Sequence, residues 1–108
     1  MSYPKLGHYR NTVNQIRKKY KVTALDFDLV LYMSEQESVN KYELRKNVTN
    51  SLSSINTSLA YMTDDKVALV KVVRKHRTGS RGLSALYAIT VKGRNMVTDF
   101  YMKMFPNQ

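Results

Sequence analysis

Apolar residues recur along the chain at spacings that switch from helical to strand-like and back again. Near the N-terminus they stand three or four residues apart, which predicts an amphipathic helix over 8–22. That helix follows an irregular arm over 1–7, where Pro4 and Gly7 disfavour regular structure. The helical stripe consists of Tyr9, Val13, Ile16 and Tyr20. The next apolar run, from Leu25 to Met33, covers most sides of a helix, which predicts a helix buried in the core.

The segment 40–65 has the pattern of two short helices joined by a polar turn. Asn40 and Glu43 have the spacing of a capping box, which predicts a helix that ends near Asn47. After a turn, apolar residues return at helical spacing and predict a second helix over about 52–65. Its core-facing stripe is Leu52, Ile55, Leu59 and Met62. This arrangement is typical of a helix-turn-helix.

The last part of the chain changes to a strand pattern and then returns to a helix. β-branched and apolar residues predict strands over 67–73 and 83–89, with a basic, glycine-containing loop over 75–82 between them. Residues 38–39 offer a very short third strand, and 91–105 has the spacing of a final helix. We therefore expect an α+β, mostly α fold: one winged helix-turn-helix domain over 1–108, with a two-stranded or three-stranded β wing and flanking N- and C-terminal helices.

The charge of the chain is strongly positive and unevenly placed. Lys and Arg number 18 against 8 Asp and Glu, for a net charge of +10. No acidic residue precedes Asp26, and none stands between Lys66 and Thr98. This segregation favours a cationic face for nucleic acid over a merely lysine-rich surface. The chain has no cysteine, and its longest wholly apolar run is too short to span a bilayer, so we expect a cytoplasmic, nucleoid-associated protein without a membrane partner.

The second helix of the helix-turn-helix carries short, uncharged polar side chains opposite its apolar stripe. Such side chains let a helix approach base edges closely, and Asn pairs well with adenine. The predicted base contacts are Ser53, Ser54, Asn56 and Thr57. The predicted phosphate contacts are Lys41, Arg45, Lys46, Lys71, Arg74 and Lys75. The predicted minor-groove contacts of the wing are Arg77 and Arg81. The alternative interpretation is a weak helix whose Ser and Thr side chains simply face water.

The final helix carries paired apolar stripes, which are broader than a single core contact needs. Helix-turn-helix proteins commonly bind two half-sites as two-fold dimers. We therefore expect the first and last helices to form a homodimer contact. The expected contact residues are Tyr9, Val13, Ile16, Val97, Phe100, Tyr101 and Met104.

Three segments resemble the MarR family of bacterial winged-helix regulators and the related SarA-type proteins. They are 23–31 at the core helix, 52–62 at the second helix of the helix-turn-helix, and 89–93 after the wing. The last of these, Ile89-Thr90-Val91-Lys92-Gly93, is similar to the Leu-Thr-x-x-Gly of the family. The resemblance implies a homodimer that binds operator DNA, with helix 52–65 in the major groove and the wing in the minor groove.

The chain also departs from the family pattern. The family usually carries Asp-x-Arg in the wing, whereas the corresponding positions here hold Arg81 and Leu83, so Arg77 or Arg81 would take that role. Lys66 stands where the family often has Gly. The terminal helices are short, so we expect no small-molecule effector.

These features favour a double-stranded DNA-binding transcriptional regulator. Two alternatives stay open: a winged-helix protein–protein adaptor, for example a phage-encoded one, and a nonspecific architectural DNA-binding protein. An enzyme is not expected, because His8 and His76 lack ligand spacing and no nucleophile or phosphate-loop motif occurs. Neither a cofactor nor a metal is expected.

Overall fold

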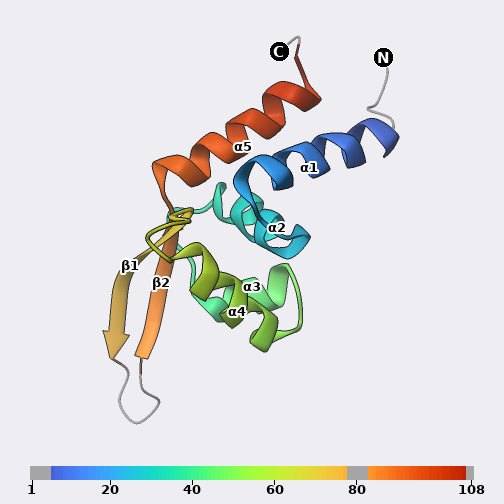
Figure 1. Cartoon of the computed structure of the whole chain (residues 1–108). Helices are drawn as coiled ribbons and strands as arrows, with labels where there is room; N and C mark the ends of the chain where they lie inside the picture. Colours follow the sequence, from blue (N-terminus) through green and yellow to red (C-terminus); the bar gives the residue numbers. More distant parts are fainter. Residues whose placement is uncertain (1–5, 78–82, 107–108) are drawn as a thin grey trace.

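The computed structural model describes residues 6–77 and 83–106, and within them the chain forms five helices and one β-hairpin. The elements follow one another as α1 (Leu6–Tyr20), α2 (Ala24–Met33), α3 (Lys41–Asn47), α4 (Leu52–Met62), β1 (Val70–Arg77), β2 (Leu83–Ile89) and α5 (Val91–Met104). Figure 1 shows α1 and α5 side by side at one end, α2, α3 and α4 grouped below them, and the hairpin projecting beside α4. This is the predicted α+β, mostly helical winged helix-turn-helix.

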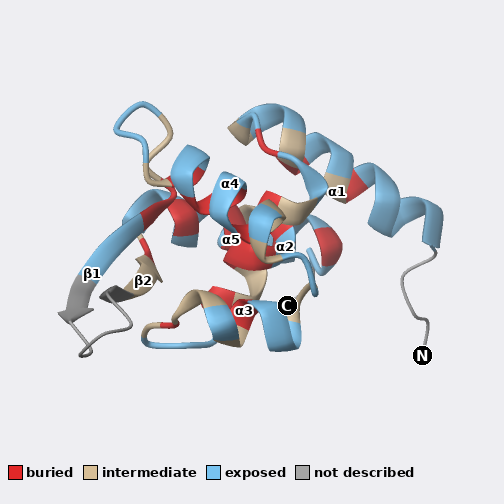
Figure 2. Cartoon of the chain, turned by 90° about the horizontal axis from the view of Figure 1, so that it is seen from below, coloured by how far each residue is buried: buried red, intermediate tan, exposed pale blue. Residues whose placement is uncertain are grey.

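Helix α2 occupies the centre of the core, as its apolar pattern predicts. Phe27, Leu29, Val30 and Met33 are each at most 1% exposed, and buried positions from the other helices surround them (Figure 2). The helix begins with a full capping box. Thr23 Oγ1 accepts from Asp26 N at 3.1 Å, and Asp26 Oδ2 accepts from Thr23 N at 2.9 Å. Two of the four backbone N–H groups that lack a partner within the helix at its start are thereby satisfied.

Helices α3 and α4 form the helix-turn-helix. Asn40 Oδ1 accepts from Glu43 N at 2.9 Å and caps α3, which is one of the two bonds of the predicted capping box. The prediction that α4 extends to residue 65 is wrong, because the helix ends at Met62. The Asp64 side chain accepts from Lys66 N at 2.9 Å, a local bond that competes with further helical bonding.

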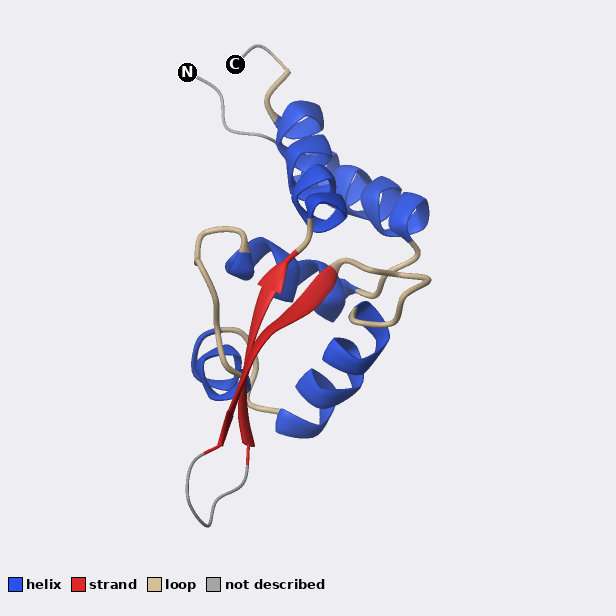
Figure 3. Ribbon diagram, turned by 90° about the vertical axis from the view of Figure 1, so that its left-hand side faces the viewer, coloured by secondary structure: helices blue, strands red, loops and turns tan. Residues whose placement is uncertain are grey.

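The wing is a two-stranded antiparallel sheet in which Val70 pairs with Ile89 and Arg77 with Leu83 (Figure 3). The possible third strand is reduced to one bridge between Val39 and Tyr87 in the described chain. The backbone nitrogen of each residue lies 2.8 or 2.7 Å from the carbonyl oxygen of the other. The predicted strand 67–73 is shifted. A turn over residues 65–67 follows α4, and Ala68 has φ 51 and donates from its N–H to Asp64 O, so β1 starts at Val70 and extends into the predicted loop.

The terminal helices pack against each other along their lengths (Figure 1). Helix α1 starts at Leu6, so the predicted arm over 1–7 is wrong for its last two residues; residues 1–5 lie outside the described part. Gly7 does not break the helix, because one glycine in a helix costs only about 1 kcal/mol relative to alanine. The helix ends at Tyr20, two residues earlier than predicted, since Lys21 takes a left-handed conformation with φ 58.

Candidate nucleic-acid interface

Helix α4 presents one face to the core and the other to solvent. Ser51 caps it by accepting from Ser54 N at 3.2 Å. Ile55, Leu59 and Met62 are buried, as the apolar stripe predicts. Because this stripe fixes the rotation of the helix, the side chains on the opposite face must point outward.

Three of the four predicted base-contact residues share that outward face. Ser53, Asn56 and Thr57 are exposed, and Ser54 is half-buried at the edge of the face. Thr57 Oγ1 donates to Ser53 O at 3.0 Å, so this hydroxyl has its proton engaged within the helix. Asn56 therefore carries the most versatile exposed group, an amide able to donate and accept.

Ser58 lines a groove beside the predicted base-contact residues, although it is not among them. It is only 5% exposed, and its Oγ donates to Oδ1 of Asp26, which is 3% exposed. The Asp26 carboxylate thus joins the start of α2 to the middle of α4. A spacing of three residues from Ile55 places Ser58 on the core-facing side, which was the available signal.

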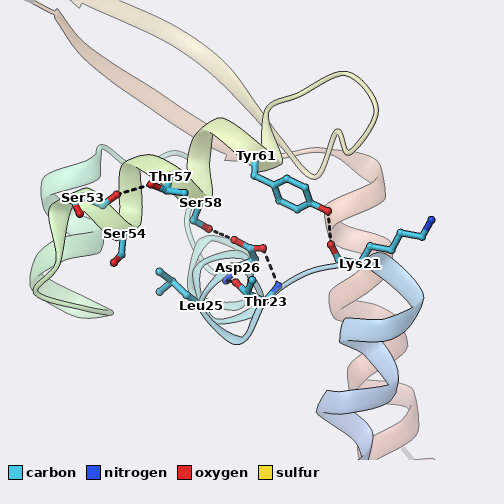
Figure 4. Close-up of a pocket in the computed structure, with 9 residues that line it drawn as sticks. All are labelled: Lys21, Thr23, Leu25, Asp26, Ser53, Ser54, Thr57, Ser58 and Tyr61. Atoms are coloured by element: carbon cyan, nitrogen blue, oxygen red, sulfur yellow. Dashed lines mark hydrogen bonds between the residues drawn. The ribbon is translucent and has the colours of Figure 1, made fainter.

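A groove of about 570 Å³ runs between α4 and the α1–α2 junction (Figure 4). Most of its side chains carry hydroxyl groups, and the buried Asp26 carboxylate lies in its wall. At one end the Tyr61 hydroxyl donates to the carbonyl oxygen of Lys21. The residues around the groove are Lys21, Thr23, Leu25, Asp26, Ser53, Ser54, Thr57, Ser58 and Tyr61.

The cations predicted to contact phosphate on α3 lie at the surface. Arg45 and Lys46 are exposed, and Lys41 is half-buried. Tyr42 is 51% exposed, because Leu44 alone fills the core position of this short helix. Lys41 Nζ and Arg45 Cζ each lie 5.8 Å from the Tyr42 ring centroid, a distance at which an aromatic face attracts cations.

The predicted cations of the wing are only partly described. Lys71 is exposed on β1. Arg74, Lys75 and Arg77 have backbones within β1, but their side chains lie outside what the structure describes. Arg81 lies outside the described residues altogether.

Most of the predicted dimer residues are already covered within one chain. Four of them pack into the core between the terminal helices and α2, as the 5.0 Å separation of the Phe27 and Phe100 rings illustrates. The four are Ile16, Val97, Phe100 and Met104. Val13 is half-buried, whereas Tyr9 and Tyr101 remain 39% and 44% exposed.

A charged cluster ties the end of α1 to α5. Asp99 Oδ2 accepts from Lys19 Nζ at 2.7 Å and from the Tyr20 hydroxyl at 2.6 Å. The hydrogen bond from Lys19, reinforced by that from Tyr20, holds the pKa of the Asp99 carboxyl below its ordinary value. Burial, together with the bond to Asp99 and its charge, raises the pKa of Tyr20 to about 12.

Neither a metal-ligand cluster nor a membrane-spanning helix occurs in the part of the chain that the structure describes. Among the side chains that the structure describes, no three His, Asp or Glu residues gather as metal ligands do. In the same part of the chain, no helix combines the length and apolar character needed to cross a bilayer.

The fold and its helix-turn-helix define the class of the protein as a winged helix. No family model matches the sequence, and no curated protein matches it significantly. The structure is similar to the crystal structure of the reduced form of MarR from E. coli, with a TM-score of 0.60 and 17% sequence identity. The match covers 99% of this chain and 81% of the MarR chain. The resemblance predicted from the sequence is therefore confirmed for the fold, which is a MarR-like winged helix.

Proposed function

We propose that this protein is a transcriptional regulator that binds double-stranded DNA, with α4 in the major groove and the basic wing at the minor groove. The observation that carries the proposal is the outward face of α4, where Ser53, Asn56 and Thr57 stand exposed and uncharged beside the core-facing stripe. Short polar side chains on a helix suit the donor and acceptor pattern of base edges.

The surrounding charge supports the proposal. Arg45 and Lys46 are exposed on the helix that precedes α4, and Lys71 is exposed on the wing. Together with the net charge of +10, these cations suit the sugar–phosphate backbone, which supplies affinity while base contacts supply specificity. A regulator of this kind acts at the bacterial or phage DNA of the nucleoid.

The proposal includes a homodimer formed through the terminal helices. Exposed apolar side chains remain on α1 and α5 after the two helices have packed against each other. They include Leu6 and Tyr9 on α1, Tyr101 and Met102 on α5, and Phe105, which caps α5. A two-fold contact through this surface would place two copies of α4 on two half-sites of one duplex.

The test is selection of duplexes from a random pool, followed by fluorescence anisotropy on the selected and on unselected duplexes. We expect the selected duplex to bind at least about 10³-fold more tightly. Asn56→Ala should lose about 1–3 kcal/mol on the selected duplex, roughly a 5- to 150-fold loss of affinity, and little on unselected ones. Asn95→Ala, which removes an exposed amide from α5, is the matched control.

Each alternative function gives a distinct result. Strong binding without preference for any duplex would indicate architectural DNA binding. Absence of binding at low salt would refute the DNA proposal and leave the adaptor as the interpretation to pursue.

A further inference from the structure

Lys21 occupies a backbone position that the turn itself would give to glycine. Helix α1 ends in a Schellman arrangement, in which Val22 N donates to Arg17 O at 3.0 Å while Lys21 has φ 58. A residue with a Cβ is disfavoured in this conformation, whereas glycine is not. The backbone of this turn therefore favours glycine over lysine, and the local fold does not account for the lysine side chain.

The junction that holds Lys21 is fixed to the proposed recognition helix by two side-chain bonds. The Tyr61 hydroxyl on α4 donates to the Lys21 carbonyl, and the Asp26 carboxylate accepts from Ser58 on the same helix one turn earlier. Figure 4 shows Lys21 at the opposite end of the groove from Ser53, with its side chain extending outward. Lys21 is exposed, so its ammonium group is presented to solvent from a backbone that is rigid relative to α4.

Cations lie near both ends of α4, and two exposed acidic residues, Asp64 and Asp65, also follow its C-terminal end. Arg45 and Lys46 end the helix that leads into the N-terminal end of α4, and Lys21 lies beside Tyr61 near the C-terminal end. With 11 residues, α4 is about 16 Å long, which exceeds the major-groove width of about 12 Å. A helix of this length that enters the groove across its width reaches both of the sugar–phosphate backbones that border it.

We propose that Lys21 binds a phosphate of the second backbone, on the side of the major groove opposite to the one that α3 contacts. This inference rests on the proposed function and adds a contact at the α1–α2 junction. Asp26 is the acidic residue that lines the groove, and it is buried and accepts two hydrogen bonds. Lys21 is therefore the charged residue at the exposed edge of the groove. The contact is to the backbone, and it should therefore be independent of base sequence.

Lys21→Gly separates a structural role from a DNA-binding role. Glycine relieves the left-handed backbone, so the melting temperature should rise while DNA binding weakens. Loss of one phosphate contact per protomer should reduce the slope of log K against log salt by about 0.9, which corresponds to about eightfold weaker binding at 0.1 M salt. The loss should be equal on selected and unselected duplexes.

Two variants complete the experiment. Ala68→Gly relieves the other left-handed residue that is not glycine within the described chain, so it should raise the melting temperature and leave the salt slope unchanged. Lys21→Arg should retain the wild-type slope. A Lys21→Gly protein with wild-type affinity and slope would overturn the inference alone, whereas a wild-type protein that binds no duplex would overturn the proposed function with it.

Discussion

Replacing Gly93 by alanine tests how closely α5 approaches the turn before the wing. Gly93 is buried in the first turn of α5, and its N–H donates to the capping hydroxyl of Thr90 at 3.1 Å. A Cβ built at this position would lie 2.4 Å from the backbone oxygen of Leu69 and 3.1 Å from Cβ of Ile89. The Leu69 oxygen cannot move freely, because it accepts from Thr90 N at 3.1 Å.

The expected magnitude is the difference between two opposing effects. Replacing glycine by alanine within a helix stabilises the helix by about 1 kcal/mol. Overpacking a filled site costs about 1–3 kcal/mol, and a backbone oxygen at 2.4 Å places this site at the upper end. We therefore expect Gly93→Ala to lower the free energy of unfolding by about 2 kcal/mol, or the melting temperature by about 8 °C for a chain of this size.

Urea denaturation of both glycine variants provides the assay and its control. Gly7 lies in the first turn of α1 with nothing within 4 Å of a built Cβ, so Gly7→Ala should be neutral or up to about 1 kcal/mol more stable. A Gly93→Ala protein as stable as the wild type would refute the close approach. It would also show that close packing against Leu69 is not the reason why glycine stands at position 93 of the segment Thr90-Val91-Lys92-Gly93.

Two further predictions concern buried and titrating groups. Asp26→Ala should lower the free energy of unfolding, measured by urea denaturation, by about 2–3 kcal/mol, because it removes a helix cap and leaves the Ser58 hydroxyl without its acceptor. The control is Asp28→Ala, at an exposed position of the same helix, which should change the free energy of unfolding by less than about 0.5 kcal/mol. The raised pKa of Tyr20 means that its neutral form stabilises the fold, so the stability advantage of wild type over Tyr20→Phe should be complete below pH 10 and vanish as the pH rises to about 12. An advantage that grows over that range would contradict the hydrogen bond from Tyr20 to Asp99.

Signals that lie close together in the sequence predicted most of the fold. The spacing of Asn40 and Glu43 predicts a helix start, and in the structure Asn40 caps α3. Features that depend on distant contacts were missed. The backbone at Ala68 is held by a hydrogen bond from the Thr90 hydroxyl, 22 positions away, and no local propensity indicates a left-handed alanine there.

The same distinction applies to the candidate interface. The outward face of α4 follows from its apolar stripe, because helical periodicity fixes which side chains oppose the core. Periodicity does not identify the neighbour that covers a stripe, so Phe100 and Met104 were assigned to a dimer although their own chain buries them. The pairing of Asp26 with Ser58 joins residues that are 32 positions apart, and neither residue alone signals it.

The measurement that tests the central claim most directly is anisotropy of a labelled random-sequence duplex with the wild-type protein across a salt series. Four predicted phosphate contacts have described side chains: Lys41, Arg45, Lys46 and Lys71. At about 0.9 per phosphate, they predict a slope of log K against log salt near −3.6 per protomer, and a steeper slope with the proposed Lys21 contact and the wing. No binding at low salt, or a slope shallower than about −1, would contradict the assignment of this winged helix to duplex DNA.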